Sequence, residues 1–206
     1  MRTQSTKKNA AKHFLAIFLP VSFTIFLILP NISKSQGHWG LEFRPGADFA
    51  TKKLGDANLK TGFGFEGTVK YYFVPSISVY AGWSWNKFAA NQSFAGTKND
   101  FEETGYTFGL QLTKPLENEN LSYLLEAGGI FNHIEIENSN GDIIADPKHG
   151  LGWQAGAGLV VRVGESFRLV PTIRYRSLSR DIKIGDGSTP VDLNYISAGV
   201  GIAWQF

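Results

Sequence analysis

The stretch that decides the fold is Val191–Phe206, which reads VDLNYISAGVGIAWQF. Counted back from the end, every second residue is apolar, and the residues between them are small or polar; the apolar set is Ile196, Ala198, Val200, Ile202, Trp204 and Phe206. A repeat of two residues is that of a β-strand. A bulky apolar side that finishes on aromatic residues is typical of a transmembrane barrel strand ending at an aromatic girdle.

The opposite end of the chain carries an export pattern. Four basic residues precede an apolar run at 14–32 that two prolines interrupt, and the small residue Ser35 follows shortly after. This order predicts a secretory signal peptide over residues 1–35, which leaves residues 36–206 as a single β-barrel domain. The alternative is an uncleaved anchor, because about 20 apolar residues can span a bilayer. The prolines and the small polar exit favour cleavage.

Charge and cysteine content narrow the function classes. Residues 1–35 hold five basic and no acidic residues, so the rest of the chain carries 15 basic and 18 acidic residues and a formal net charge of −3. No basic patch then calls for a nucleic-acid partner. The chain has no cysteine, so it forms no disulfide and carries no acylated cysteine.

Alternation of apolar and polar residues recurs along the whole exported part. It marks eight segments, at 39–49, 60–73, 77–87, 101–112, 121–136, 149–163, 167–178 and 191–206. The longer connections at 51–59, 88–100, 137–148 and 179–190 alternate with shorter ones, as they do in outer-membrane barrels. Because lipid offers no hydrogen-bond partner to an open sheet edge, such a sheet must close. We therefore predict an all-β, eight-stranded antiparallel transmembrane β-barrel.

Two irregularities are expected in these strands. The apolar residues change sides near His133, which predicts a bulge or the end of the strand there. Pro171 lies midway along its segment and has no N–H to donate, which predicts a bulge or a local gap in the ladder.

The other face of the strands predicts what fills the barrel. Glycines alternate there with long polar groups, as a narrow interior requires. Arg44, Glu66, Glu126 and Arg174 fall near mid-strand on this face, and we predict that they form an internal ion-pair cluster, since unpaired buried charges are costly. The alternative is a soluble barrel of the lipocalin type with an apolar interior. That alternative would leave an exterior with too many glycines and too few charges.

The chain resembles the small outer-membrane β-barrel families, namely the OmpA transmembrane domain, OmpX and OmpW, and most generally the outer membrane protein beta-barrel domain group common in Bacteroidetes. The residues that carry the resemblance are Trp39–Arg44, Glu126–Gly129 and Ala203–Phe206; cleavage before Gln36 also fits that phylum. The resemblance implies a place in the outer-membrane lipid and insertion by the outer-membrane assembly machinery, with Trp204 and Phe206 as the assembly signal.

Catalytic and metal-binding patterns are weak. His38, His133 and His149 are scattered, although the last two could adjoin across neighbouring strands with Asp142, Asp146 and Ser177 nearby. We expect no enzyme activity, cofactor or metal site. Two functions remain. The first is a structural or surface-interaction barrel, with a packed polar interior, whose four outer loops contact a surface ligand or protein partner. The second is a passage or binding barrel for small, apolar molecules of the OmpW type, which an open lumen with a lateral gap at Pro171 would favour.

Overall fold

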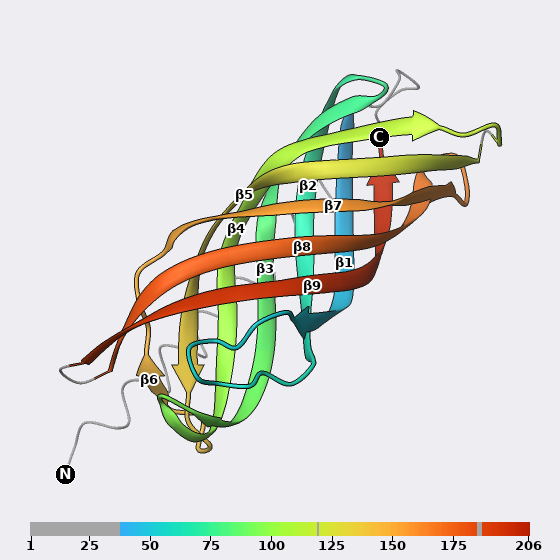
Figure 1. The fold of residues 1–206 in the computed structure, drawn as a ribbon. Coiled ribbons are helices and arrows are strands. Elements are labelled where there is room, and N and C mark those ends of the chain that lie inside the picture. The colour runs from blue at the N-terminus through green and yellow to red at the C-terminus, as the bar shows by residue number, and fades with distance from the viewer. Residues whose placement is uncertain (1–37, 119, 185–186) are drawn as a thin grey trace, which may run out of the picture. The chain divides into compact units, whose positions relative to one another are not determined.

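The computed structural model describes residues 38–118, 120–184 and 187–206; the predicted signal peptide at 1–35 lies outside these residues. Within them the chain forms nine strands (Figure 1): β1 Trp39–Ala50, β2 Gly62–Val74, β3 Ile77–Ser93, β4 Gly96–Pro115, β5 Leu121–Glu137, β6 Ile143–Ala145, β7 Gly150–Arg162, β8 Phe167–Ile184 and β9 Gly187–Gln205. In the described part of the chain, no helix has both the length and the apolar character needed to cross a membrane.

Eight of these strands close into a ring. Each pairs antiparallel with the next, from β1 through β5 to β7, β8 and β9, and β9 then pairs with β1. Backbone hydrogen bonds between Trp39 and Phe206 close the ring at its last residues, with N···O distances of 3.3 and 3.0 Å. The predicted eight-stranded antiparallel barrel is therefore confirmed, and the three-residue strand β6 lies beside the end of β5.

Two of the four predicted long loops are mostly strand. The β3–β4 ladder continues to Ser93↔Gly96, and the β8–β9 ladder continues to Ile184↔Gly187, so the predicted loops at 88–100 and 179–190 are wrong. The sequence still alternates there, but the apolar residues have moved to the inward positions: Phe88, Ala90, Ile182 and Val191 are buried. A sequence prediction that requires apolar residues on the outward face therefore ends each strand too early, where the apolar residues move to the inward face.

The same move of apolar residues to the inward face explains why the sequence pattern changes near His133. The β4–β5 register runs unbroken from Asp100↔Glu137 to Pro115↔Ser122, so the bulge predicted near His133 is wrong. Ile134 and Ile136 keep the inward parity of Asn132 and are fully buried. It is the filling of the barrel that changes at this level, while the backbone stays regular.

Pro171 does open a gap in one ladder. The β7–β8 pairing passes from Gly158↔Thr172 to Val161↔Leu169 with no pair between, and the register is the same on both sides. Pro171 keeps its place opposite Val200 in β9. Because proline lacks an N–H, the ladder is interrupted locally without a bulge.

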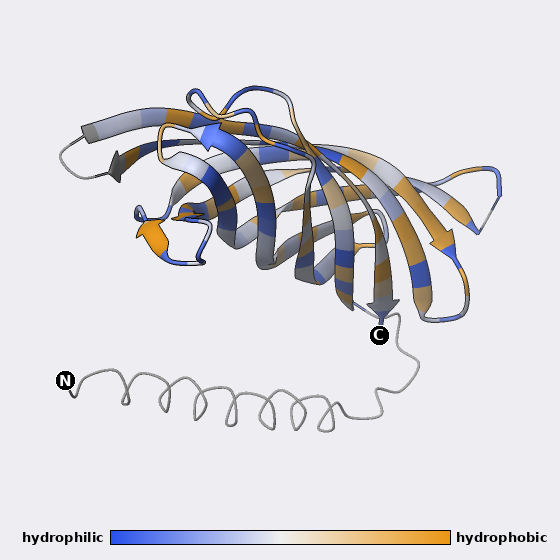
Figure 2. Cartoon of the chain, turned by 90° about the horizontal axis from the view of Figure 1, so that it is seen from below, coloured by the Kyte–Doolittle hydropathy of each residue, from blue (hydrophilic) through white to orange (hydrophobic). Residues whose placement is uncertain are grey.

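The outward face of the barrel divides into two zones. Near the termini, outward residues are apolar and exposed, including Phe43, Val69, Phe108, Leu125, Ile173 and Ile202. Towards the opposite end, which we call the loop end, the outward positions become polar: Lys87 of β3 forms ion pairs with Asp100 and Glu102 of β4 and with Glu137 of β5, at 3.0, 2.7 and 3.1 Å. Figure 2 shows hydrophilic and hydrophobic residues alternating along the strands.

The interior divides in the opposite sense. Its main group of ion-paired residues lies in the apolar-banded half, whereas the loop end encloses a cluster of buried hydrophobic residues. We call this the loop-end core; it comprises Leu54, Ala57, Phe88, Ala90, Phe101, Ile130, Ile134, Ile136, Ala145, Leu178, Ile182, Val191, Leu193 and Tyr195. Glu103 and Arg176 are buried at the edge of that cluster, beside Tyr195. Leu54 and Ala57 come from the β1–β2 connection, so this loop folds inward as part of the core.

Candidate functional sites in the barrel interior and at the rim

The four predicted interior residues meet in the barrel. Arg44 of β1 lies 3.8 Å from Glu66 of β2 and 3.1 Å from Glu126 of β5. Arg174 of β8 approaches the same two carboxylates, at 2.7 and 3.5 Å. Each side chain is almost fully buried. Two arginines and two glutamates from four strands therefore form one charge-balanced ring across the lumen, built by the alternation that turns every second residue inward.

Further ion pairs lie above and below this ring and were not predicted as part of it. Towards the termini, Glu42 contacts Arg44 and accepts a hydrogen bond from Lys70 at 2.5 Å, and Lys70 also donates to Gln111. Towards the loop end, Arg176 lies 3.9 Å from Glu103. The signal was present in the sequence, because these residues have the same inward parity as the predicted four.

Tyr80 and Gln154 fill the lumen beside the charges. The Gln154 side-chain amide donates to the Tyr80 hydroxyl at 3.0 Å. Glycines make room for this tyrosine: a Cβ added at Gly109 or Gly128 would lie 2.6 or 2.7 Å from the hydroxyl oxygen. The interior at this level is therefore occupied by side chains from opposite walls.

Two hollows lie in the apolar-banded half of the barrel. One, of about 200 Å³, lies in the lumen near the termini, and its lining includes Glu42, Lys70, Arg162 and Arg168. The other is a groove of about 420 Å³ on the outward face around Pro171, lined by Ala157, Gly158, Leu159, Pro171, Thr172, Ile173, Ala198, Gly199 and Val200. The groove follows the interrupted ladder and is almost wholly apolar.

Lysines gather on one side of the loop end. Lys52, Lys53 and Lys60 of the β1–β2 connection and Lys98 of the β3–β4 hairpin are all exposed. The two segments are joined, because Asp56 accepts a hydrogen bond from the Phe94 backbone N–H at 2.6 Å and Lys60 N–H donates to the Ala89 carbonyl at 2.8 Å. We call these four residues the lysine face.

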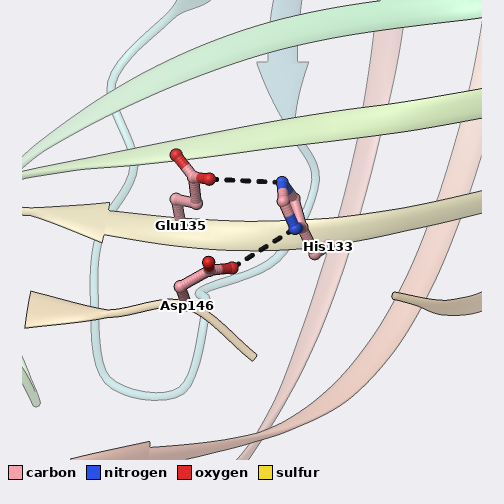
Figure 3. Close-up of side chains that lie close together, drawn as sticks. All are labelled: His133, Glu135 and Asp146. Atoms are coloured by element: carbon pink, nitrogen blue, oxygen red, sulfur yellow. Dashed lines mark ion pairs between the residues drawn. The ribbon is translucent and has the colours of Figure 1, made fainter. Parts of the chain in front are cut away.

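A second polar group lies on the rim, where β5 approaches the segment between β6 and β7. The His133 ring lies between two carboxylates (Figure 3): its Nε2 is 3.4 Å from Glu135, and its Nδ1 is 3.2 Å from Asp146. The His149 ring centre is 4.3 Å from that of His133. Slight desolvation, together with the neighbouring His133, lowers the pKa of the exposed His149 and so favours its neutral imidazole.

The structure brings together only part of the predicted rim group. His133, His149 and Asp146 adjoin, and Glu135, which sequence reasoning missed, joins them. Asp142 instead bonds to Asn138 within its own turn. Ser177 pairs with Trp153 and Asn194 in the sheet, and His38 lies near the Tyr72 carbonyl among the terminal residues.

The two predicted assembly residues stack at the end of β9. The rings of Trp204 and Phe206 lie 4.6 Å apart. Trp204 pairs with Leu41 of β1 and with Phe167 of β8, so it lies at the seam where the ring closes.

Comparison with known proteins identifies this architecture. The family described as outer membrane protein beta-barrel domain matches residues 21–206. Neisserial surface protein A is similar in structure, with a TM-score of 0.61, 14% identity, and coverage of 82% of this chain and 97% of that one. OprG, an outer membrane protein from Pseudomonas aeruginosa, is similar with a TM-score of 0.56 and 14% identity, and the match covers 83% of this chain and 98% of OprG. The attachment invasion locus protein Ail of Yersinia pestis, solved in complex with the heparin analogue sucrose octasulfate, is similar with a TM-score of 0.50 and 18% identity. The match covers 82% of this chain and 100% of Ail. No curated protein matches the sequence.

Proposed function

The chain belongs to the outer membrane protein beta-barrel domain family, and from this premise we propose that it is a surface-interaction barrel of the outer membrane. In this proposal the barrel wall anchors the chain in lipid, and the loop end, turned outward, contacts a surface ligand or protein partner. The connections at the termini end are short, whereas two of the four at the loop end, between β1 and β2 and between β5 and β7, are long. This difference supports the orientation, because outer-membrane barrels place their short turns in the periplasm.

The observation that carries the proposal is the filling of the lumen at two successive levels. The ring of Arg44, Glu66, Glu126 and Arg174 occupies the level within the apolar band. The loop-end core lies above it and includes the inward-folded part of the β1–β2 connection. An eight-stranded barrel is only wide enough to be filled by side chains. Contacts at the outside, rather than flow through the inside, are the function that this arrangement supports.

The charge of the lysine face favours an anionic surface polysaccharide as the ligand. Its four exposed lysines lie on two segments that hydrogen bonds hold together. Fixed cations attract a polyanion over several ångströms, and the attraction weakens as salt rises.

Conductance tests the closed lumen. The purified chain is reconstituted into a planar bilayer, and single-channel current is recorded under an applied potential. We expect no steps above the background of protein-free bilayers. Regular, reproducible conductance steps would contradict the packed interior and remove the main support for the proposal.

Binding to immobilised heparin tests the ligand class. Cells that display the barrel should bind the polysaccharide, and the variant with Lys52, Lys53, Lys60 and Lys98 changed to Glu should lose most of this binding. Lys114→Glu is the matched control, because Lys114 is also exposed but lies near the termini. Equal binding by both variants would exclude the lysine face. A salt-independent interaction would exclude the anionic ligand.

A second candidate is lateral passage of small apolar molecules, and the groove at Pro171 favours it. There the β7–β8 ladder is interrupted beside an apolar hollow of about 420 Å³. Uptake of an apolar fluorescent dye by cells that produce the wild-type barrel or Pro171→Val would test it. Faster uptake with the wild type supports passage, and identical rates with and without the barrel exclude it.

We also propose that Trp204 and Phe206 are read during assembly. Their position at the closing seam supports this role. Deletion of Phe206 should lower the amount of barrel in the membrane several-fold while leaving the urea midpoint of the folded fraction nearly unchanged. An unchanged amount in the membrane would contradict the proposal; Phe73→Ala, which also removes an exposed aromatic near the termini end, is the control.

A further inference from the structure

The rim group forms a geometry that none of the functions above uses. We propose that His133, Glu135, Asp146 and His149 bind one divalent transition-metal ion of the zinc or copper type. Two of these residues belong to the end of β5, and two to the segment between β6 and β7. A bound ion would therefore join that segment to the barrel wall.

The donor atoms are already close to one another. One ligand atom from each of His133, Glu135 and Asp146 can be chosen so that all three lie within 4.8 Å of one another. Tetrahedral zinc, with ligand distances of about 2.0–2.2 Å, needs its ligands about 3.4 Å apart. Side-chain rotations of Glu135 and Asp146 can supply this contraction, because both carboxylates are accessible from the water side of the rim. His149 is not one of these three residues, but its ring centre lies 4.3 Å from that of His133. A side-chain rotation would bring one of its ring nitrogens to the ion as the fourth ligand.

The charges around the group call for a cation. Glu135 lies directly opposite Glu102 in the β4–β5 ladder, and like charges in that position repel each other. Lys87 pairs with Glu102, Glu137 and Asp100. Among the ion pairs of the described residues, Glu135 and Asp146 each have His133 as their partner. The two carboxylates together balance the charge of one divalent ion.

Arg180, whose charge acts on His149, does not take this place. The Nη2 group of Arg180 donates to the backbone carbonyls of Asn132 and Gly150, so main-chain oxygens hold this end of the guanidinium. Within the described part of the chain, Glu135 and Asp146 form ion pairs with His133 and not with Arg180. Its charge opposes cation binding at long range, and the two carboxylates offset it.

The donor types select the metal class. Two imidazoles and two carboxylates suit zinc, copper and nickel, whereas magnesium and calcium favour all-oxygen sites. The position reinforces this choice: the group lies above the apolar band and beside the Lys87 network, where water and ions have access.

Equilibrium dialysis against Zn²⁺ tests the proposal. The full chain is purified in detergent from outer membranes at neutral pH, with a tag that contains no histidine, and bound zinc is measured by mass spectrometry. We expect one zinc per chain. Loss of a partner that merely orients a ligand weakens metal sites about 10–100-fold, so His133→Gln and His149→Gln, which each remove a ligand, should weaken binding about 100-fold. Mg²⁺ in large excess should not compete.

The matched control is His38→Gln, which removes the histidine near the termini and should leave zinc binding unchanged. Asp146→Asn, in an exposed segment, is a further variant in case His133→Gln fails to fold, and heat-modifiable gel mobility verifies the fold of each variant. Absence of zinc from the wild type overturns the proposal. So does binding that His149→Gln and Asp146→Asn leave unchanged.

Discussion

The two halves of the barrel have opposite radial polarity. In the half near the termini, Phe43 faces outward and is half exposed, while its neighbour Arg44 is buried in the lumen. In the loop-end half, Lys87 faces outward in an ion-pair network, while its neighbour Phe88 is fully buried. The strands run through both halves with an unchanged two-residue repeat. Only the medium outside the wall differs.

This comparison shows what sets side-chain polarity in a membrane barrel. Within lipid, apolar residues are required on the outside, so a narrow lumen receives the polar ones and must pair them. Above the lipid, water meets the wall, and the hydrophobic effect drives apolar residues into the lumen as in a soluble protein. The loop-end half is in this sense a small soluble barrel built on a membrane barrel. The predictions below test the two halves separately.

The largest effect is expected from Glu126→Leu in the membrane half. It removes a carboxylate shared by Arg44 and Arg174 and leaves one buried positive charge in excess in the ring, so stability should fall by about 3–5 kcal/mol. Urea unfolding of the detergent-solubilised barrel measures this loss. Glu117→Leu, at an exposed turn, should change stability by less than about 0.5 kcal/mol. An unchanged midpoint for Glu126→Leu would show that the ring does not stabilise the barrel.

Phe101→Ala tests the loop-end core. Phe101 is fully buried in this core beside Phe94, and removing a buried phenyl group costs about 3 kcal/mol or more. The same urea titration measures the loss. Phe108→Ala is the control: Phe108 lies on the same strand but faces outward, so the substitution leaves no interior cavity. Equal losses for both variants would contradict the soluble-like character of this half.

Leu110→Lys tests the lipid-facing surface. Leu110 is exposed on the outward face in the apolar band. A lysine on the lipid face of a β-barrel costs up to about 2–4 kcal/mol, with the largest cost at the bilayer midplane. Unfolding from lipid vesicles measures this cost. Asn91→Lys, on the loop-end part of β3, should cost at most about 1 kcal/mol, because that position faces water. If Asn91→Lys cost as much as Leu110→Lys, the boundary between the halves would be misplaced.

The smallest effect is expected from Pro171→Val. Valine restores an N–H to the interrupted β7–β8 ladder, and one added hydrogen bond contributes about 0.5–1.5 kcal/mol. A slightly higher urea midpoint should accompany slower hydrogen exchange at Leu159 and Val160. Unaltered exchange at those amides would mean that the gap does not arise from the missing donor.

Much of the fold could be predicted from alternation alone. The two-residue repeat predicts the eight strands and their antiparallel order, because β-strands place successive side chains on opposite faces. It also predicts which residues point inward, including Arg44, Glu66, Glu126 and Arg174. The strand ends at 88–100 and 179–190 could not be placed in this way. There the alternation continues, but the apolar residues face the lumen and the polar residues face outward. A prediction that expects apolar residues on the outside mistakes this stretch for a loop.

The rim group illustrates a second limit. Histidine spacing in the sequence predicts no metal site, since His133 and His149 are 16 positions apart and lie on either side of the β6 segment. They meet because that segment folds back on β5, with Ile136 opposite Ala145. Glu135 enters the group only because the strand continues past the place where a bulge was predicted.

The sequence by itself determined the closed antiparallel barrel, the faces of its strands and, through VDLNYISAGVGIAWQF, the strand that closes it. These follow from a local repeat and from the need to pair every backbone group in lipid. Tertiary structure alone decided how high the strands rise, where the interior changes from charged to apolar, and which rim residues meet. Those features depend on contacts between strands that are far apart in the chain and on whether lipid or water surrounds each part of the barrel. The local sequence pattern determines neither.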